Sequence, residues 1–223
     1  MNLVFYGGGD AQDNKALDRG LMDMVGKSSP HMSFIPSQSY ESEIDFGLFV
    51  KQYRRLGVKS FLHFPVDIRF DKILLEEVLN SDIIHLSGGN TFYFLKHLKR
   101  SGMLPRLRDF VKRGGILTGL SAGAIIMSPN ITTASFPEFD RDDNDENLKD
   151  FRSINLVQFE VFPHYSNSAR YRAEMEKYSK KIPYPLYGCP NGSGILVKEG
   201  HLYFVGKVFK FEKGKTLCLP GKT

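Results

Sequence analysis

Short apolar runs alternate with amphipathic segments along the first 120 residues of the chain. Buried strands are predicted where such a run is bounded by polar or glycine positions, at residues 3–6, 31–35, 60–64, 82–86 and 116–118. Helices are predicted where apolar residues recur at helical spacing, at residues 14–25, 40–56, 70–79, 92–98 and 104–113. This alternation, with short connections, predicts an α/β fold in which helices cover both faces of a mostly parallel sheet.

The pattern changes after residue 121. Residues 135–150 are rich in acidic and poor in apolar side chains, which predicts a long surface loop. A strand is then expected at 155–162, a polar helix at 169–181 and several short strands from residue 184 onwards. No repeat or interdomain linker is visible, so residues 1–223 are expected to form a single α/β domain.

Composition and charge narrow the class of protein. The chain has 223 residues, of which 41% are hydrophobic, and a formal net charge of +5. The basic residues at 96–113 fall on two successive predicted helices, which favours a solvated helix face over a nucleic-acid-binding patch. No apolar run suits a transmembrane helix, and the first residues lack the character of a signal peptide. We therefore expect a cytoplasmic monomer or homodimer, with no nucleic-acid or membrane partner.

The stretch from Gly119 to Gly123 is the first candidate for chemistry. It reads Gly-Leu-Ser-Ala-Gly and fits the G-x-S-x-G pattern, in which a serine occupies a sharp strand-to-helix turn. Free N–H groups at the start of the following helix favour negative charge, which suits a nucleophile whose product is an oxyanion. The alternative is a glycine-rich turn whose serine, Ser121, only caps a helix.

Two other clusters could hold a ligand. Glycines 7–9 follow the first strand but lack the full dinucleotide-binding fingerprint, so we expect a connection at the rim of the site. The acidic cluster at 140–146 lacks the glycine and the distal glutamate of a calcium-binding loop, and the two cysteines lack metal-ligand spacing. No metal or other cofactor is expected, and both thiols are expected to be reduced.

A serine nucleophile needs a base to take its proton, and the chain offers six histidines. His63 and His85 lie within predicted apolar strands and are expected to be structural. His164 differs because it follows an apolar strand and Pro163, at the beginning of a loop. This is where an α/β enzyme can present a base to its nucleophile, so His164 is the predicted base.

Three motifs together resemble a known family. Gly88-Gly89-Asn90-Thr91, Gly119 to Ala124 with Ser128-Pro129, and Phe162-Pro163-His164-Tyr165 have the order and approximate spacing of peptidase E. That family is the aspartyl dipeptidase group of serine peptidases and is related to cyanophycinase. The resemblance covers nearly the whole chain. It implies a flavodoxin-like, class I glutamine amidotransferase-like three-layer sandwich, no metal, and hydrolysis of dipeptides that begin with aspartate.

The resemblance also implies roles for individual residues. Ser121 would be the nucleophile and His164 the general base and then the acid. The N–H groups of Gly89 and Ala122 would form an oxyanion hole, in keeping with donors from two strand ends that bracket one oxygen. Asn90 and Thr91 would line the substrate pocket.

An arginine after the histidine would bind the carboxylate of the substrate, because a guanidinium matches a carboxylate in bidentate fashion. Arg172 is the better match to the family and Arg170 is the close alternative. The competing interpretation is that both arginines are solvated charges on the helix at 169–181.

The sequence departs from the family at the third member of the expected triad. Phe136 stands where the family has an acidic residue. We expect Glu138 to orient the base, with Asp140, or no third residue, as alternatives. Later, Asn191 replaces an acidic residue that some relatives carry, which affects the recognition of the amino terminus of the substrate.

Two other functions compete with a serine dipeptidase. The first is a catalytically weak relative that binds a small acidic ligand or peptide, which Phe136 favours. The second is a nucleotide-binding module built around glycines 7–9, which the absence of a P-loop disfavours.

Overall fold

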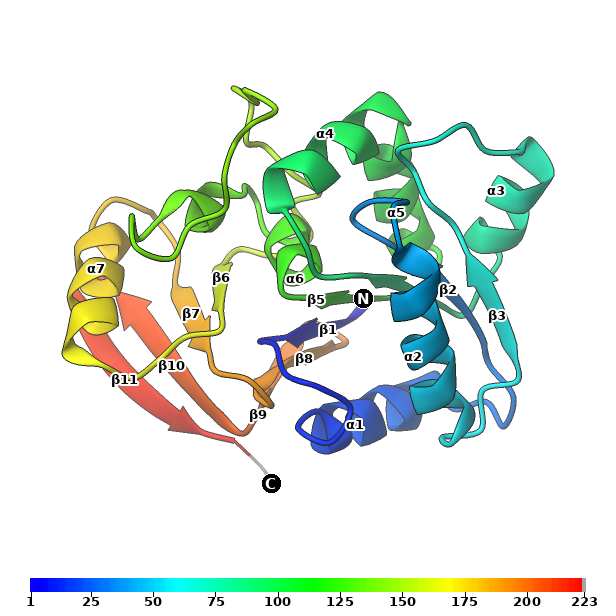
Figure 1. The fold of residues 1–223 in the computed structure, drawn as a ribbon. Helices are drawn as coiled ribbons and strands as arrows, with labels where there is room; N and C mark the ends of the chain where they lie inside the picture. The colour runs from blue at the N-terminus through cyan, green and yellow to red at the C-terminus, as the bar shows by residue number, and fades with distance from the viewer. Residues whose placement is uncertain (222–223) are drawn as a thin grey trace.

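The computed structural model describes residues 1–221, which form two β-sheets flanked by helices (Figure 1). The larger sheet has seven strands in the order β3-β2-β4-β5-β1-β8-β9. These strands are β1 (Asn2–Tyr6), β2 (His31–Ile35), β3 (Ser60–His63), β4 (Ile83–Leu86), β5 (Ile116–Leu120), β8 (Gly194–Lys198) and β9 (His201–Val205). Strands β1 to β5 run parallel to one another, β8 pairs antiparallel with β1, and β9 pairs antiparallel with β8.

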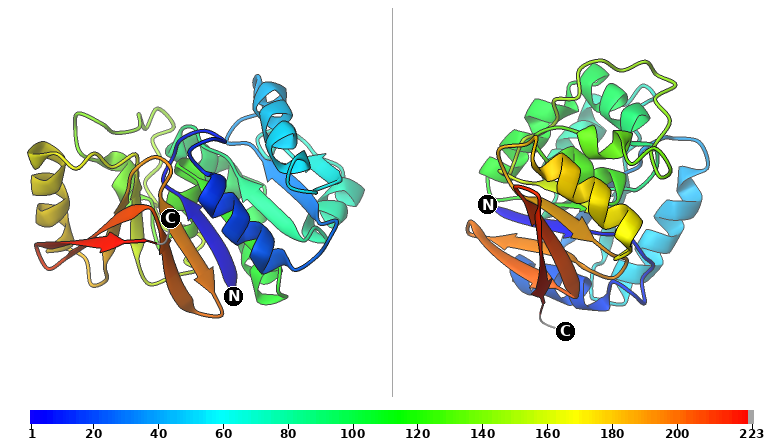
Figure 2. Two further views of the ribbon diagram at one scale, coloured as in Figure 1. Left: turned by 90° about the horizontal axis from the view of Figure 1, so that it is seen from below. Right: turned by 90° about the vertical axis from the view of Figure 1, so that its left-hand side faces the viewer.

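Helices cover both faces of the larger sheet (Figures 1 and 2). One face carries α1 (Lys15–Val25) and α2 (Ser42–Arg54), which share a buried core with the strands. The opposite face carries α3 (Lys72–Leu79), α4 (Thr91–Arg100), α5 (Met103–Lys112) and α6 (Ala122–Met127). The predicted α/β class, with a mostly parallel sheet between two layers of helices, is confirmed.

The smaller sheet stands beside the larger one and has four strands in the order β11-β10-β7-β6 (Figure 2). Its strands are β6 (Glu160–Pro163), β7 (Leu186–Cys189), β10 (Lys207–Glu212) and β11 (Lys215–Pro220). Helix α7 (Ala169–Ser179) packs against this sheet around a separate buried cluster that includes Phe162, Met175 and Phe211. The end of the chain therefore builds a second layer with its own core.

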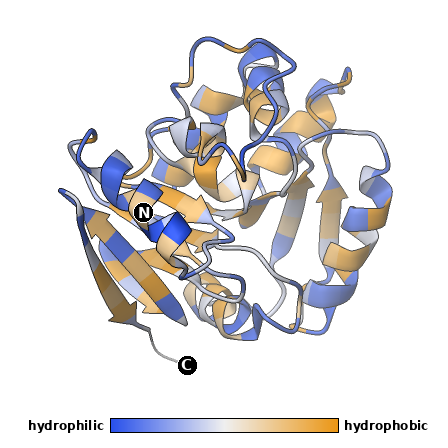
Figure 3. Cartoon of the chain, turned by 60° about the vertical axis from the view of Figure 1, so that its left-hand side comes forward, coloured by the Kyte–Doolittle hydropathy of each residue, from blue (hydrophilic) through white to orange (hydrophobic). Residues whose placement is uncertain are grey.

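Apolar residues gather in the strands and on the inward faces of the helices, whereas the segment after α6 is mostly polar (Figure 3). No helix within residues 1–221 combines the length and the apolar character needed to cross a bilayer.

The strand predicted at 155–162 is shorter than expected. Only residues 160–163 form a strand, and a short 3-10 helix occupies Thr132–Ser135 within the preceding segment. The N–H groups of residues 153–156 donate to carbonyls at the end of α6 and just after it, for example Ile154 to Ile126 at 3.2 Å. These N–H groups are therefore not available to a β-ladder.

Candidate active site

Ser121 lies at the turn between β5 and α6 with φ 51° and ψ −110°, a backbone conformation that is costly for a residue with a β-carbon. Both flanking glycines are required by close packing. A Cβ on Gly119 would overlap the backbone of Gly123, and a Cβ on Gly123 would overlap the carbonyl of Leu86. The pattern G-x-S-x-G is thus explained by the close approach of β4, β5 and α6 around an exposed hydroxyl.

A chain of hydrogen bonds leads away from this hydroxyl. Ser121 Oγ lies 2.8 Å from His164 Nε2, and His164 Nδ1 lies 2.8 Å from Asn191 Oδ1. Because an amide oxygen only accepts, Nδ1 carries the proton and donates it to Asn191. Nε2 is then free to accept from Ser121, which is the tautomer that a general base requires.

His164 is held in place by the backbone of the first strand. Its N–H donates to the carbonyl of Gly7 at 2.7 Å, and its own φ is 53°. Gly8, with φ 129°, lies directly behind the imidazole, so that a Cβ there would overlap the ring and the Asn191 amide. The N–H of Gly192 donates to the Gly8 carbonyl at 3.1 Å. The glycine run is therefore at the rim of the site, as predicted, and it fastens the histidine.

Two backbone N–H groups lie close to the serine. Gly89, with φ 129°, precedes α4, and Ala122 is the first residue of α6, where helix geometry provides no acceptor for its N–H. The neighbouring donors are occupied, since Ser121 N–H binds the Tyr6 carbonyl and Gly123 N–H binds the Ser87 carbonyl. Among the described residues, no hydrogen bond uses the N–H of Gly89 or of Ala122.

The prediction that Glu138 orients His164 is wrong. Its carboxylate pairs with Arg141 at 2.8 Å, and its side chain is 79% exposed. The alternative, Asp140, accepts a hydrogen bond from the Tyr171 hydroxyl at 2.7 Å. The reason is local packing: the Phe136 ring packs at a tilt against the Tyr178 ring with centroids 4.3 Å apart, which anchors the segment against α7.

The group that orients His164 is Asn191, which the sequence analysis linked to substrate recognition instead. The signal was present in the segment Gly188 to Gly192, where an amide replaces an acidic residue. Its meaning depends on the position of β7, because Asn191 follows the strand that pairs in parallel with β6, and His164 follows β6. Residues 27 positions apart are thereby brought into hydrogen-bond contact.

Asn90 is the N-cap of α4 and Thr91 is its first residue, and both hold the acidic segment; their role in the substrate pocket stays a prediction. The Asn90 oxygen caps the helix by accepting from the Tyr93 N–H at 2.9 Å, and its NH₂ group donates to the Asp143 carbonyl at 2.8 Å. Thr91 is only 1% exposed, and its N–H donates to the Asp142 carboxylate at 2.8 Å. A carboxylate at a helix N-terminus is electrostatically favourable, which explains why the acidic segment docks there.

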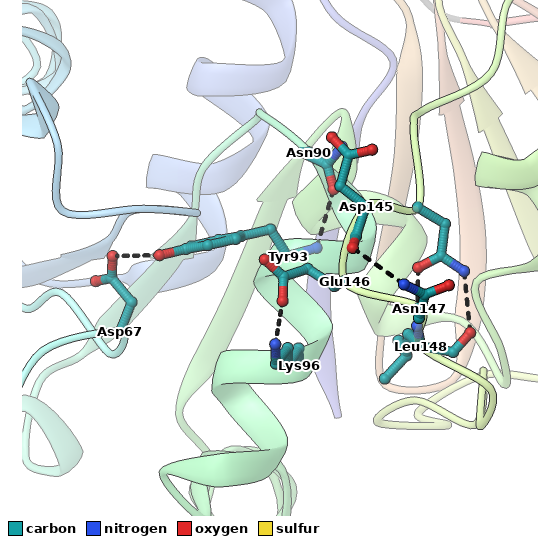
Figure 4. Close-up of polar contacts among 9 residues, drawn as sticks. Asp67, Asn90, Tyr93, Lys96, Asp145, Glu146, Asn147 and Leu148 are labelled. Atoms are coloured by element: carbon teal, nitrogen blue, oxygen red, sulfur yellow. Dashed lines mark hydrogen bonds and ion pairs between the residues drawn. The ribbon is translucent and has the colours of Figure 1, made fainter.

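Further contacts hold this segment on α4 (Figure 4). Glu146 forms an ion pair with Lys96, and Tyr93 extends in the other direction to the Asp67 carboxylate, which its hydroxyl reaches at 3.1 Å. The predicted loop is thus an ordered strap over the amino-terminal half of α4.

The two arginines predicted to bind the substrate carboxylate, Arg170 and Arg172, lie in α7 and contact other side chains of the protein. The Arg172 guanidinium donates to Asn167 at 2.9 Å and borders a cavity of about 440 Å³ that neither Ser121 nor His164 lines. The role of Arg172 in binding the substrate carboxylate stays a prediction. The guanidinium of Arg170 lies over the ring of Phe139, 3.3 Å from its centroid.

A serine at the carboxyl end of a parallel strand that is hydrogen-bonded to a histidine is an arrangement typical of a hydrolytic enzyme. Comparison with known families agrees with this class. The model of peptidase family S51 matches residues 3–205, and the chain belongs to this family. The protein is therefore a peptidase.

Individual relatives support the same assignment. An uncharacterized peptidase of Pasteurella multocida is 30% identical over 184 residues, which cover 80% of this chain and 86% of that protein. Peptidase E of Escherichia coli is 32% identical over 131 residues, which cover 55% of this chain and 54% of that protein.

Solved structures agree in fold. A structure described as that of a candidate peptidase E protein from Listeria monocytogenes aligns with a TM-score of 0.69 at 24% identity, covering 92% of this chain and 98% of that one. A peptidase from an acI-B1 actinobacterium aligns with a TM-score of 0.72 at 20% identity, covering 100% and 95%. The predicted resemblance to peptidase E and its flavodoxin-like sandwich is confirmed.

Proposed function

We propose that the protein is a serine-type dipeptidase that hydrolyses small peptides, with Ser121 as nucleophile and His164 as general base and then acid. The observation that carries this proposal is the continuous hydrogen-bond chain from Ser121 through His164 to Asn191. Such a chain activates a hydroxyl that is otherwise a poor nucleophile.

The proposed reaction follows from these positions. Ser121 transfers its proton to His164 Nε2 while Oγ bonds to the carbonyl carbon of the peptide. The N–H groups of Gly89 and Ala122 stabilise the oxyanion, and the imidazolium then donates its proton to the leaving amine. Water, deprotonated by the same histidine, releases the acyl group and regenerates the serine.

Dipeptides with an amino-terminal aspartate are the proposed substrates, because the family resemblance implies them. Arg172 is the proposed partner of the aspartate carboxylate, as the resemblance implies, and Arg170 is the close alternative. A weakly active, ligand-binding relative is the competing function, and the neutral Asn191 in place of a carboxylate is the feature that favours it.

The experiment compares Ser121→Ala with the unchanged protein on Asp-Ala and Asn-Ala. The unchanged protein is expected to cleave Asp-Ala faster, and Ser121→Ala is expected to lose about 10⁴-fold or more in kcat on either substrate. Ser101→Ala, a substitution at the C-terminus of α4, is the control and should retain full activity.

Labelling by a fluorophosphonate separates the two candidate functions. An activated serine reacts with this probe, so the unchanged protein should be labelled and Ser121→Ala should not. If Ser121→Ala kept most of the hydrolysis, the serine mechanism would be refuted. If no labelling and no hydrolysis occurred, the ligand-binding alternative would stand.

A further inference from the structure

A cavity of about 540 Å³ opens next to the serine on the face of the sheet that carries α1 and α2. Ser121 and His164 do not line it, but Leu120 and Gly88 do. Leu120 immediately precedes the serine, and a Cβ on Gly88 would lie 3.5 Å from the Ser121 Cβ. A group held in this cavity is therefore adjacent to the proposed nucleophile, on the opposite face of the sheet from α4 and its acidic strap.

One wall of the cavity is preformed by the connection from β1 to α1. The Asp10 N–H binds the Asp13 carboxylate at 3.0 Å, and the Gln12 N–H binds the Asp10 carboxylate at 2.7 Å. Asn14 closes the turn by donating to the Gly9 carbonyl at 3.3 Å. These bonds order the wall without any ligand.

The second wall is fixed by a buried carboxylate between the two helices. Asp18 of α1 accepts from the hydroxyls of Tyr6 and Tyr53, each at 3.0 Å, and from the Gln52 amide at 2.7 Å. Burial raises the pKa of Asp18. Because α1 and α2 are tied together at this point, the cavity does not close by movement of one helix onto the other.

The floor holds a neutral histidine with one unused nitrogen. His85 is 5% exposed, and burial lowers its pKa to about 3. Its Nδ1 lies 2.7 Å from the Thr118 hydroxyl, which has no other partner among the described residues. The hydroxyl proton therefore goes to Nδ1, and Nε2 carries a proton of its own. Among the side-chain hydrogen bonds of residues 1–221, His85 takes part only in the one through Nδ1.

Aromatic rings surround the imidazole of His85. His85 stacks on Phe34 with centroids 5.8 Å apart and an interplanar angle of 13°, and its centroid is 5.1 Å from that of Phe49. Tyr6 meets the imidazole edge-on at 6.2 Å. Such a lining favours a planar aromatic group. The rim of the cavity carries two acidic and two basic side chains, so it does not favour a ligand of one charge over another. These residues are Asp10, Asp45, Lys51 and Arg55.

We infer that the cavity is the subsite for the second residue of the substrate, that this residue is aromatic, and that His85 Nε2–H donates to a tyrosine hydroxyl there. The inference deepens the proposed function and depends on it for the position of the scissile bond. A tyrosine is expected to bind about 3- to 10-fold more tightly than a phenylalanine, the effect of one buried hydrogen bond.

Binding can be measured without catalysis. N-acetyl-tyrosinamide and N-acetyl-phenylalaninamide are titrated by calorimetry into the Ser121→Ala protein. Leu48 lines the cavity and is 61% exposed, whereas Ile44 is 65% exposed one turn earlier on α2 and does not line it. Leu48→Trp should weaken binding of both amides about tenfold or more by filling the cavity, and Ile44→Trp should leave binding unchanged. The proposed subsite would be overturned if Leu48→Trp and Ile44→Trp bound the amides equally well. It would also be overturned if Ser121→Ala without a second substitution bound neither amide.

The role of His85 has its own test. His85→Phe keeps a ring of similar shape and should bind both amides equally, because the donor is lost. If His85→Phe does not fold, the imidazole ¹⁵N resonances of His85 in Ser121→Ala provide the answer. The Nε2 resonance should shift with the tyrosine amide and not with the phenylalanine amide, and equal shifts would refute the hydrogen bond.

Kinetics distinguish this inference from the proposed function. The intact protein should hydrolyse Asp-Tyr with a kcat/KM about tenfold or more above that for Asp-Ala, and Leu48→Trp should remove the difference. Equal rates for the two substrates without amide binding would refute the subsite alone. Amide binding without hydrolysis of any dipeptide would refute the proposed function and leave an aromatic-binding site.

Discussion

Asn191 presents an amide oxygen, which has no formal charge, to the imidazole of His164. An amide can fix the tautomer as a carboxylate does, but it stabilises the imidazolium formed in the transition state less. The residue therefore acts as a positioning group through His164.

We expect Asn191→Leu to lower kcat about 100-fold or more with little change in KM, because Nδ1–H loses its acceptor. Asn191→Asp should restore or exceed the original kcat, which a purely structural role would not predict. Glu138→Gln is the matched control and should change neither constant, since Glu138 faces solvent. Steady-state kinetics on one dipeptide decide this, and a kcat for Asn191→Leu equal to that of the unchanged protein would contradict it.

His85 gives the protein a specific dependence of stability on pH. Its pKa is about 3 in the folded chain, below the ordinary value of 6.5, because burial disfavours the charged form. Above pH 6.5 the ring is neutral in both states and stability is complete. As pH falls below 6.5, the unfolded chain gains a proton that the folded chain refuses, so stability is lost by about 1.4 kcal/mol per pH unit.

His85→Phe should remove this loss, and the slope of unfolding free energy between pH 6 and pH 4 should become about 1.4 kcal/mol per unit shallower. Urea denaturation at several pH values measures the slope. His201→Phe, at the exposed first position of β9, is the control and should leave it nearly unchanged. An identical slope for His85→Phe and the unchanged protein would disprove the assignment.

At the scale of elements, α4 and the acidic strap depend on one another. Asn90 caps the helix and also binds the strap through Asp143, whereas Asp71 caps α3 without a strap. The two caps therefore form a matched pair that differs in one contact.

Asn90→Ala and Asp71→Ala should each cost about 1 kcal/mol of stability as helix caps are lost. Only Asn90→Ala should also accelerate proteolytic cleavage within residues 137–150, because the strap loses an anchor. Chemical denaturation measures the loss of stability. Limited proteolysis, under conditions in which both variants have the same folded fraction, measures the rate of cleavage. Equal cleavage rates for the two variants would show that the strap is held independently of Asn90.

At the scale of the whole molecule, the proposed site is divided between the two sheets. Ser121 follows β5 of the larger sheet, whereas His164 and Asn191 follow β6 and β7 of the smaller one. Gly7 and Gly8 join these parts, since their carbonyls accept from His164 and Gly192. The distance between Ser121 and His164 therefore depends on how the two sheets pack against each other.

Gly8→Ala is expected to lower kcat about 10- to 100-fold, because the added methyl group pushes the imidazole away from Ser121. Gly26→Ala is the control. Gly26 also has a positive φ, 62°, but nothing lies within 4 Å of the carbon that the substitution would add. Gly26→Ala should lose about 1 kcal/mol of stability and no activity. The idea fails if both variants retain the same kcat.

The amino-acid sequence alone predicts the features that depend on neighbouring residues. The parallel strands followed from apolar runs with glycine-bearing connections, and Ser121 followed from a pattern in which both glycines prove sterically necessary. His164 was found because a histidine after an apolar strand and a proline lies where a strand ends. In each case the information lies within about ten residues, the range over which backbone sterics and periodicity act.

Which groups far apart in sequence come into contact depends on how the whole chain packs. The sequence predicts Glu138 as the residue that orients His164 and links Asn191 to substrate recognition. The packing of Phe136 against Tyr178 and the pairing of β6 with β7 instead bring Asn191 to the imidazole. The same holds for the strap over α4 and for the cavity at His85. A hydrogen bond depends on tenths of an ångström and on side-chain direction, and between segments far apart in sequence these are set by how whole sheets and helices pack.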